Sequence, residues 1–581
     1  MWLTRTRSHM SDSHARLERL TSMLRRRGVI LPAFEIHGGV AGLFDFGPNG
    51  ARLCRRLKDS WIDHWSSHGN IVEIDSPTIT PESVLIASGH VGEFNDYMSE
   101  CNACNGAFRS DHLVEGKHPN PDILTADELD GIISENRITC PTCGAEDWKS
   151  ARPMNLMFST RIGAMKGGRS AYMRPETAQG MFMLFPALYR HFRNRLPFGA
   201  VQTGKGYRNE ISPRQGMIRL REFNMAELEY FIDPDAETNH DFSKWSETSF
   251  NLVPDPESGV PIAMDPGTAA SENVIRHPTV AWFMARTWDF LVSVGIDPAR
   301  IRFRQHEGTE MAHYATDCWD AEIHGSYGWI ECVGIAHRGC YDLAAHETAT
   351  GDNNLRAWRP YDEPKIVDKT IMSGKGSVIG PSFRDKAGLV NTALESLDSE
   401  TAAFPFELAL EDGTEVTIEE GMVETKHIQS TEHGEWFLPH VVEPAFGIDR
   451  ILWHVLDHAF DETEKGGESY TVLRLNPSVA PIDVAILPLM EKDGLDSMAE
   501  EIHRMICSTK NLASYYDGSG SIGRRYARAD EVGVPWAVTV DHESLQNGSV
   551  TIRRRDDGEQ MRIQPDDLMA ALSSDTISSL F

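Results

Sequence analysis

A stretch of 22 residues that begins at Arg208 constrains the fold of this chain more than any other segment. It consists of two short segments with apolar flanks and a Pro/Gly turn between them, which predicts a strand, a loop and a second strand. Because strand side chains alternate with period two, Arg208 and Glu210 are expected on one face of the first strand. Arg219, Arg221 and Phe223 are expected on one face of the second strand.

These five side chains suit a nucleotide. A guanidinium fork can bind a phosphate, and a flat ring can stack on a base. A carboxylate can accept a hydrogen bond from an exocyclic amine. The alternative interpretation is a charged, solvated hairpin, and the other segments of the chain decide between the two.

Length and composition limit the class of protein. A chain of 581 residues is too long for one core and is expected to form about three or four domains. It has no run of 18 apolar residues, so no transmembrane helix is expected. The start is basic but has no apolar core, which argues against a secretory signal; we expect a leader or an upstream start, with Met10 or a nearby residue as the true beginning. Nine cysteines in such a long chain indicate a reducing interior.

The charge of the chain is strongly negative. The formal net charge is −30, and Arg outnumbers Lys about three to one. Such a charge repels nucleic acid, unless salt shortens the Debye length to about 3 Å at 1 M. Either the partner is not a nucleic acid, or the protein works in high salt, where an acidic surface preserves solubility. We favour the second interpretation and expect a halophilic protein.

Periodicity gives a coarse order of elements. Leu53, Leu57, Trp61 and Trp65 recur every four residues and predict an amphipathic helix. Strands, insertions and a final α/β region of about 100 residues are expected downstream. The expected segments are helices at 13–27, 51–68 and 277–294, a strand at 71–80, strand-rich stretches at 160–231 and 300–345, a loop at 233–275, a polar insert at 350–440, and a strand followed by a helix at 443–457.

Four cysteines form two Cys-x-x-Cys pairs. Cys101 pairs with Cys104 in this pattern, and Cys140 with Cys143. Four thiolates match a tetrahedral zinc site, although the gap between the pairs is longer than usual. The alternative is four free cysteines that remain from a lost site.

Several further stretches carry a family resemblance. They are Phe34–Pro48, Arg174–Gly180, Met311–Asp320 and Glu443–Arg450, the last followed by an apolar helix. With the stretch from Arg208, they resemble class II aminoacyl-tRNA synthetases. Their residues are most similar to those of the glycyl-tRNA synthetase family of the homodimeric, archaeal and eukaryotic-like type. The stretch from Arg208 resembles motif 2 of that class, Glu443–Arg450 resembles motif 3, and the helix and strand at 51–80 resemble motif 1.

The resemblance implies a fold and a division into domains. The fold class is α+β, with an antiparallel-sheet catalytic domain, inserts of which one binds zinc, and a C-terminal α/β anticodon-binding domain. The implied domains are 1–100, the first part of the catalytic domain with motif 1; 101–150, the zinc-binding insert; 151–349, the catalytic core with motif 2; 350–440, an insert domain; 441–479, the catalytic core with motif 3; and 480–581, the anticodon-binding domain.

The resemblance also implies a reaction and its site residues. Glycine is activated by ATP to glycyl-adenylate and transferred to the 3′-end of tRNA(Gly), with Arg208, Arg450 and Glu331 as catalytic residues. The implied glycine-site residues are Arg109, Glu176, Phe223, Asn224, Met225, Ala226, Glu227, Glu443, Pro444, Ala445, Phe446 and Gly447. The implied ATP-site residues are Arg208, Asn209, Glu210, Ile218, Arg219, Leu220, Arg221, Glu222, Phe223, Glu331, Cys332, Gly447, Ile448, Asp449 and Arg450. Arg524, Arg525, Tyr526 and Arg528 are implied to contact the anticodon of tRNA.

The chemistry of glycine sharpens this expectation. Glycine has no side chain, so a selective site must bind the ammonium with carboxylates and leave no room at the α-carbon. Glu176 and Glu227 fit such an acidic pocket. Two departures from the family concern its details, because Ala445 stands where Ser is common and His337–Gly339 replaces Asp-Arg-Ser.

The resemblance also implies metal ions, an oligomeric state and a location in the cell. It implies Mg²⁺ with ATP, held in part by Glu331, structural Zn²⁺ on the four cysteines, a homodimer in the cytoplasm and no membrane. Two alternatives stay open from the sequence. One is another class IIa aminoacyl-tRNA synthetase, and the other is a non-catalytic synthetase-like protein that binds nucleic acid.

Overall fold

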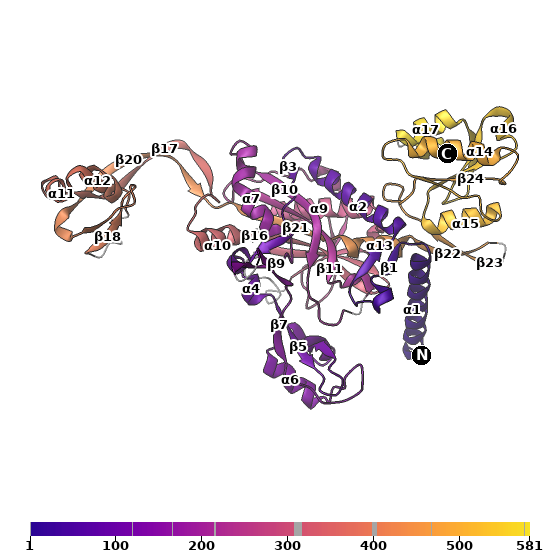
Figure 1. Cartoon of the computed structure of the whole chain (residues 1–581), viewed down its shortest axis with the longest axis horizontal. Coiled ribbons are helices and arrows are strands. Elements are labelled where there is room, and N and C mark those ends of the chain that lie inside the picture. Colours follow the sequence, from indigo (N-terminus) through magenta and orange to yellow (C-terminus); the bar gives the residue numbers. More distant parts are fainter. Residues whose placement is uncertain are drawn as a thin grey trace. The chain divides into compact units, whose positions relative to one another are not determined.

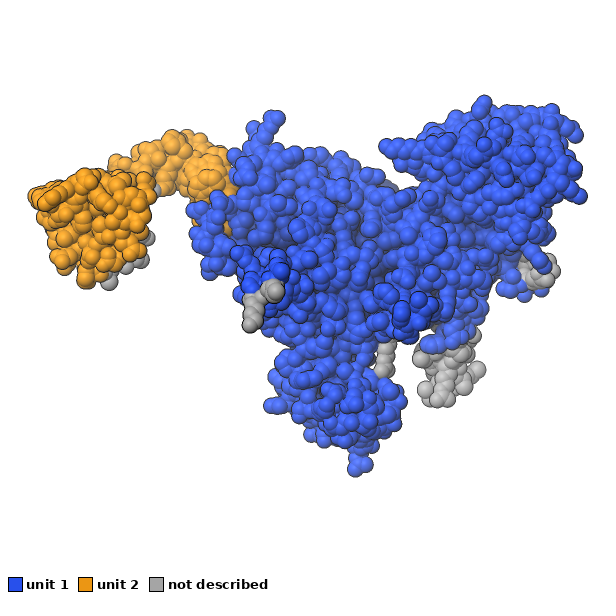
Figure 2. Space-filling view, viewed as in Figure 1, with its two compact units in different colours: residues 1–355, 439–581 blue, residues 356–438 orange. Residues whose placement is uncertain are grey.

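The computed structural model of the chain describes residues 2–118, 120–164, 167–213, 216–306, 317–397, 404–465, 467–574 and 576–581. The chain forms two compact units (Figures 1 and 2). One consists of residues 1–355 and 439–581, and the other of residues 356–438. Within the stretch Met311–Asp320, residues 311–316 lie outside the described part. No helix in the described residues is long and apolar enough to cross a membrane.

A nine-stranded sheet forms the centre of the first unit. The strand order is β13-β12-β14-β15-β16-β21-β11-β10-β3. The pairs β10–β3 and β12–β14 are parallel, and the other pairs are antiparallel, so the expected antiparallel α+β core is confirmed with a mixed character toward its edges. The strands are β3 (Ile71–Glu73), β10 (Phe198–Tyr207), β11 (Glu222–Ile232), β12 (Phe250–Val253), β13 (Ile262–Met264), β14 (Ile301–Gln305), β15 (Asp317–Gly325), β16 (Gly328–Gly339) and β21 (His440–Gly447).

Helices cover both faces of this sheet. On one face, Trp61 and Trp65 of α2 pack on Phe446 of β21, with ring centroids 5.5 and 6.0 Å apart. On the other face, Phe185 of α7 packs on Phe231 of β11 at 5.0 Å. Alternate residues of β11 therefore face different helices. The helices are α2 (Pro48–Ser66), α7 (Ala178–His191), α9 (Pro278–Ser293), α10 (Tyr341–Thr350) and α13 (Ile448–Ala459).

Several boundaries differ from the sequence-based expectation. The strand expected over 71–80 is two short strands, β3 and β4 (Ile79–Pro81), because Pro77 between them has no N–H for a ladder. The loop expected over 233–275 contains β12, β13 and α8 (Pro266–Ser271). Phe250 and Leu252 alternate into the core with almost no exposed surface, which explains why β12 joins the sheet.

The first two helices are present as expected, but both begin earlier in the chain. The helix expected over 13–27 is α1 (Trp2–Arg26), and α2 begins at Pro48, a residue that suits the first turn of a helix. A short antiparallel pair, β1 (Ile30–Pro32) and β2 (Phe44–Phe46), lies between these helices in the chain.

Two small sheets follow α2 in the chain. The first contains Met98 and Phe108 in small apolar clusters, and Ile211 of the loop after β10 joins the cluster of Met98. Its elements are β5 (Asn95–Glu100), β6 (Ala107–Arg109), β7 (Arg152–Asn155), α5 (Ser110–Leu113) and α6 (Ala126–Glu135). The second consists of β4, β8 (Ser159–Ile162) and β9 (Arg169–Met173), near α3 (Glu82–Ala87) and α4 (His90–Glu93).

The C-terminal part of the first unit is an α/β domain with its own core. Its sheet has the order β25-β24-β26-β27-β28, and the first three strands are parallel. The elements are β24 (Val484–Pro488), α14 (Leu495–Cys507), β25 (Ser514–Tyr516), α15 (Ile522–Val532), β26 (Trp536–Val540), α16 (Ser544–Asn547), β27 (Val550–Arg554), β28 (Gln560–Ile563) and α17 (Pro565–Ser573), preceded by the hairpin β22 (Phe460–Lys465) and β23 (Glu468–Leu473). The expected C-terminal α/β domain is confirmed.

The second unit falls within the polar stretch 350–440. A long antiparallel pair, β17 (Ala357–Gly374) and β20 (Val423–Phe437), leads into a small helical core around Val390, Leu394 and Ile418. The remaining elements are α11 (Gly376–Phe383), α12 (Ala387–Glu395), β18 (Phe406–Ala409) and β19 (Glu415–Ile418).

Candidate active site

The strand–loop–strand stretch has the predicted order but different limits. β10 ends at Tyr207 and β11 begins at Glu222, so Arg208, Glu210, Arg219 and Arg221 lie in the connecting loop. The expectation that they sit on two strands is wrong. Arg208 N–H still donates to Arg221 O at 2.9 Å, but beyond this bond the chain turns away from the ladder. The loop brings the charged side chains over the end of the sheet.

A cavity opens beside this loop and contains most of the residues implied for ATP. It is bounded by the loop, β11, β16, β21 and the start of α13. Among the described residues its lining is Arg208, Glu210, Met217, Ile218, Arg219, Leu220, Phe223, Asn224, Met225, Glu227, Glu331, Cys332, Gly334, Ala445, Phe446, Gly447, Asp449 and Arg450. Met217 and Gly334 are the members that the sequence analysis did not name.

Other predicted residues sit near the cavity without lining it. Ala226 and Ile448 are buried in the core, and Arg221 donates to the carbonyls of Glu210 and Ala41. Glu222 faces Lys205 at 3.5 Å. The predicted residues outside the described lining are Arg109, Glu176, Asn209, Arg221, Glu222, Ala226, Glu443, Pro444 and Ile448.

Arg208 lies between two aromatic rings. Its Cζ is 5.3 Å from the ring centre of Phe94 and 5.5 Å from that of Phe223. Its Nε donates to Pro175 O at 3.4 Å. Cation–π contacts of this kind orient a guanidinium while its remaining N–H groups stay available.

Arg450 lies in the first turn of α13, next to Glu331 of β16. Its Nη1 donates to Glu331 O at 2.7 Å and lies 3.7 Å from the Glu331 carboxylate. Asp449 beside it is buried and accepts from Asn224 N at 2.7 Å and Asn224 Nδ2 at 2.8 Å. These bonds tie the start of α13 to β11, so the positive end of the helix faces the cavity.

The other end of the cavity is acidic. Glu227 of β11 is buried and accepts from Thr177 N at 2.7 Å and Thr177 Oγ1 at 2.5 Å, just before α7. Glu176 accepts from Gln179 Nε2 at 3.0 Å, and His90 Nε2 lies 3.3 Å from its carboxylate. Glu443 of β21 is two residues from Ala445, which pairs with Glu227 in the sheet. Of these three described carboxyl groups Glu227 lines the cavity, and the charges of Glu176 and Glu443 both act on it.

One residue of this region, Arg338 of β16, was absent from the predicted site residues. It donates to Glu443 Oε2 at 2.5 Å and to both oxygens of Asp342 at 2.8 and 3.0 Å. The residue appeared in the sequence only within a stretch that departs from the family. Glu443 lies 105 positions away, and only the pairing of β16 with β21 brings the two together.

The carboxyl groups have different protonation preferences. Burial, followed by the charges of Glu443 and Glu176, raises the pKa of Glu227 to about 8, although Thr177 opposes the shift. Burial also favours neutral Glu176, but the charge and hydrogen bond of His90 outweigh it and hold the pKa of Glu176 well below its usual range. The site therefore contains one anionic carboxylate and one that is largely neutral at pH 7.

Arg109 lies at the edge of the small sheet that contains β5 and β6. It is 2.9 Å from Asp96 and 2.5 Å from Asp111. Arg219 Nη1 of the loop donates to Nε2 of His112, near Arg109, at 3.1 Å. Arg109 thus belongs to a charged cluster next to the loop and not to the lining of the cavity.

Both departures from the family pattern are visible. Ala445 presents a methyl group to the cavity at the position opposite Glu227. His337 is buried and stacks on His277, with ring centres 4.5 Å apart, and it lies 5.3 Å from His440. His337 therefore belongs to a histidine cluster beside the sheet.

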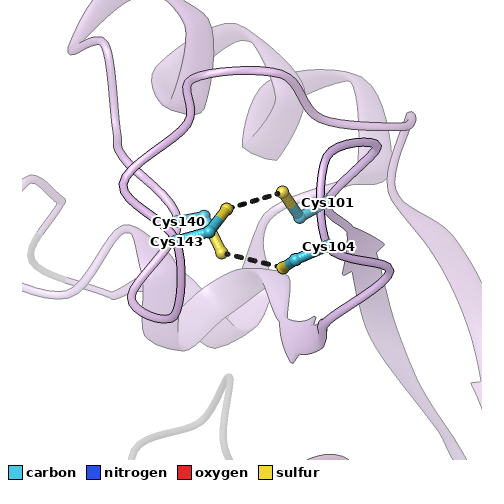
Figure 3. Close-up of side chains that lie close together, drawn as sticks. All are labelled: Cys101, Cys104, Cys140 and Cys143. Atoms are coloured by element: carbon cyan, nitrogen blue, oxygen red, sulfur yellow. Dashed lines mark hydrogen bonds between the residues drawn. The ribbon is translucent and has the colours of Figure 1, made fainter.

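The four cysteines come together as the sequence predicts (Figure 3). Cys101 Sγ lies 3.6 Å from Cys143 Sγ, and Cys104 Sγ lies 3.7 Å from Cys140 Sγ. Tetrahedral zinc with Zn–S bonds of ~2.3 Å requires sulfur atoms about 3.8 Å apart. All four sulfur atoms lie within 4.8 Å of one another. The cluster is compatible with structural zinc.

The residues predicted to contact tRNA have different environments. Arg525 is buried and donates to the carbonyls of Pro488, Gly518 and Gly520, so its side chain supports the loop before α15. It is not accessible to a nucleic acid. Arg524 is exposed.

Arg528 and Tyr526, the other two predicted residues, contact neighbouring side chains of the same domain. Arg528 makes a two-pronged pair with Asp517 at 2.7 and 2.9 Å. Tyr526 is covered on its ring by Arg553 at 4.9 Å, and its hydroxyl lies 2.5 Å from Thr539 Oγ1. Of the four predicted residues, Arg524 is therefore the most open to solvent.

Comparison with known proteins identifies the class of protein that has this fold and this site. Residues 161–275 match the tRNA synthetase class II core domain (G, H, P, S and T), and residues 483–575 match an anticodon binding domain. The fold is similar to prolyl-tRNA synthetase of Giardia lamblia in complex with prolyl-adenylate, with a TM-score of 0.50, 14% identity, and coverage of 96% of this chain and 75% of that one. The sheet, the cavity and the C-terminal domain thus define a class II aminoacyl-tRNA synthetase.

Closer relatives identify the family. The glycine--tRNA ligase of Methanothrix thermoacetophila is 45% identical, with coverage of 95% of both chains. Those of Methanothermobacter thermautotrophicus and Methanocaldococcus jannaschii are 43% and 42% identical, with coverage of 96% and 95% of this chain and 98% and 97% of theirs. The chain belongs to the glycine--tRNA ligase family of the archaeal type. The resemblance found in the sequence is confirmed.

Proposed function

We propose that the protein activates glycine with ATP and transfers it to the 3′-end of tRNA(Gly). In the first step, a glycine carboxylate oxygen attacks the α-phosphorus of ATP in line, and pyrophosphate leaves as the new P–O bond forms. In the second step, the 3′-hydroxyl of the terminal ribose attacks the carbonyl carbon and AMP leaves. Neither step needs a protein nucleophile, so catalysis consists of positioning and charge neutralisation.

The residues with the strongest support for ATP binding are Arg208, Phe223 and Arg450. The guanidinium of Arg208, held between two rings, suits the α-phosphate and the glycine carboxylate. The ring of Phe223 suits the adenine face, and Glu210 suits the adenine amine. Arg450 at the start of α13 suits the γ-phosphate, because the helix end adds positive potential there.

Glycine recognition is assigned to the acidic end of the cavity. An ammonium group can bind to buried carboxylates, and Glu176, Glu227 and Glu443 offer them within a small region. The methyl group of Ala445 lines the cavity opposite Glu227, and we expect it to exclude a larger α-substituent. This convergence of carboxyl groups carries the proposal.

Mg²⁺ would accompany ATP. The Glu331 carboxylate is about half exposed at the rim of the cavity and offers the hard oxygen ligand that Mg²⁺ prefers. When bound, the ion would neutralise phosphate charge. Glu331 would hold the ion, and Arg450, whose Nη1 lies 3.7 Å from the Glu331 carboxylate, would bind a phosphate oxygen directly.

We assign tRNA contacts to the C-terminal domain, with Arg524 as its most accessible member, and structural zinc to the four cysteines. The division into domains at 1–100, 101–150, 151–349, 350–440, 441–479 and 480–581 belongs to the same proposal. So do a homodimer in the cytoplasm and adaptation to high salt, which is supported by the net charge of −30.

ATP–pyrophosphate exchange with a panel of amino acids tests the proposal. Glycine should support exchange, and Arg208→Ala should lower the rate at least ~100-fold while the fold stays intact, as for other lost transition-state donors. Exchange near the wild-type rate in Arg208→Ala would refute the role of Arg208. Exchange with proline or threonine instead of glycine would support a different class IIa enzyme.

A further inference from the structure

Glu229 of β11 is an unusual residue, because it is fully buried without a partner. Its exposed fraction is 0%, and neither carboxylate oxygen has a hydrogen-bond partner among the described residues. Buried polar groups are almost always hydrogen-bonded, since desolvation without compensation is costly. A group of this kind therefore calls for a functional explanation.

Its position in the sheet links it to the glycine site. Glu227 and Glu229 share one face of β11, because strand side chains alternate. The register pairs Glu227 with Ala445 and Tyr230 with Val442, which sets Glu229 opposite Glu443 on β21. The carboxyl oxygens of the three glutamates lie within 4.8 Å of one another. Among the three, Glu227 lines the described cavity, and Glu229 and Glu443 do not.

The neighbouring charges decide the state of Glu229. It is surrounded by Glu227 on the same strand, Glu443 on β21, Arg338 on β16 and Asp342 on α10. Arg338 is already bonded to Glu443 and Asp342. Like charges placed directly opposite each other in a sheet are destabilising, so a second anion facing Glu443 is unfavourable. Burial and the charge of Glu443 raise the pKa of Glu229 well above its ordinary value.

We propose that Glu229 is a neutral carboxylic acid that positions Glu227 and Glu443 for glycine recognition, because its single O–H can turn to donate to whichever of these two nearby carboxyl groups is ionised. It is a positioning residue, because the cavity lining contains Glu227 but not Glu229. Its proton lets three carboxyl groups gather without three negative charges. The substrate ammonium then meets a preorganised pair of acceptors. This inference rests on the proposed function, since it assumes that glycine binds at Glu227 and Glu443.

Two substitutions distinguish three possible roles of Glu229: a proton donor, an anion, or a side chain that only packs. Glu229→Gln keeps the shape and a donor without a charge, whereas Glu229→Met keeps length but has no donor. The experiment measures KM for glycine, KM for ATP and kcat in ATP–pyrophosphate exchange for the full chain. Glu415→Gln is the control, because Glu415 is exposed in the second unit.

Glu229→Gln should keep KM for glycine within about threefold of wild type. Glu229→Met should raise KM for glycine at least tenfold, with kcat and KM for ATP within about threefold and an unchanged or higher Tm, because an unsatisfied buried carboxyl is lost. If Glu229→Met leaves KM for glycine unchanged, the residue is only structural and the proposal fails. If Glu229→Gln raises KM for glycine as much as Glu229→Met does, Glu229 acts as an anion and the proposal also fails.

Infrared difference spectra at pH 7 give a second readout that does not depend on folding of the Met variant. The wild-type minus Glu229→Gln spectrum should contain the carbonyl band of a protonated carboxyl group, and the wild-type minus Glu415→Gln spectrum should not. A carboxylate band in the first spectrum would overturn the proposal. Failure of the proposed function is distinguishable, because wild-type protein would then show no glycine-dependent exchange while the infrared result would stand.

Discussion

At the scale of single residues, Arg338 explains how a crowded acidic site can exist. Its guanidinium binds Glu443 and Asp342, so part of the negative charge is neutralised inside the sheet. Breaking a buried pair of this kind leaves an uncompensated charge, which typically costs about 3–5 kcal/mol. The negative charge that is not neutralised in this way is then available for a substrate ammonium.

The raised pKa of Glu227 predicts a pH-dependent affinity for glycine. An ammonium binds best to the ionised carboxylate, and burial raises the pKa of Glu227 to about 8. KM for glycine should therefore fall as pH rises toward about 8, by up to about tenfold per pH unit, and level off above it. The sign follows from the raised pKa, because the neutral form dominates below it. Glycine titrations of pyrophosphate exchange between about pH 6 and 8.5 measure this.

KM for ATP serves as the internal control, since the phosphate end of the cavity depends on Arg208 and Arg450. A glycine KM that is flat over this range, while KM for ATP is also flat, would contradict the assignment of Glu227.

Residue identities were easier to predict than their partners. Most of the cavity lining was named from the stretches at Arg208 and Glu443, because those stretches supply adjacent strands. Arg338 was missed, since its partner Glu443 is distant in the chain and is reached only through the register of β16 and β21. Arg525 was expected on the surface, but a buried guanidinium that donates to four carbonyls leaves no sign in the sequence.

At the scale of elements, the segment with the four cysteines is expected to depend on a metal for its order. Its apolar clusters are small, and Cys101 and Cys140 are buried within one of them. Metal analysis should find about one zinc per chain, and chelation should raise hydrogen exchange between residues 95 and 155 but not in the C-terminal domain. Cys104→Ser should act like chelation, and Cys507→Ser, at an exposed cysteine, should not. Substoichiometric zinc in freshly purified protein would contradict this.

At the start of α15, Arg525 and Arg524 are expected to have different roles: Arg525 supports the preceding loop, and Arg524 contacts tRNA. Arg525→Ala removes four hydrogen bonds to carbonyls and should raise hydrogen exchange in residues 517–522. Arg524→Ala should leave exchange unchanged but raise KM for tRNA about three- to tenfold, as for a lost phosphate contact. Pyrophosphate exchange should stay near wild type in both. Equal effects of the two substitutions on tRNA and on hydrogen exchange would contradict the distinction.

The sequence predicted whether the long segments are helices or strands, but it did not show which short segments join the sheet. The four-residue spacing in α2 predicted a helix correctly, because Trp61 and Trp65 define one buried face. The stretch 233–275 was expected to be a loop, since its acidic and Pro-rich composition hides the short alternation in β12. The strands at Arg208 were predicted too long, because the ladder ends where the loop begins to face the cavity.

At the scale of the whole molecule, the net charge of −30 should make stability depend on salt. Self-repulsion falls as the Debye length shrinks from about 10 Å at 0.1 M to about 3 Å at 1 M. Tm should therefore rise with KCl over this range, and aminoacylation should peak at high salt. A maximum of activity below about 0.2 M would show that the acidic surface is not an adaptation to salt.

Competition between glycine and alanine in the charging of tRNA(Gly) tests the central claim most directly. A walled, acidic site rejects the extra methyl by clash, so kcat/KM should favour glycine by more than the roughly 200-fold that a methylene in an apolar pocket provides. Alanine charged within about tenfold of glycine would contradict the assignment of this cavity as the glycine site.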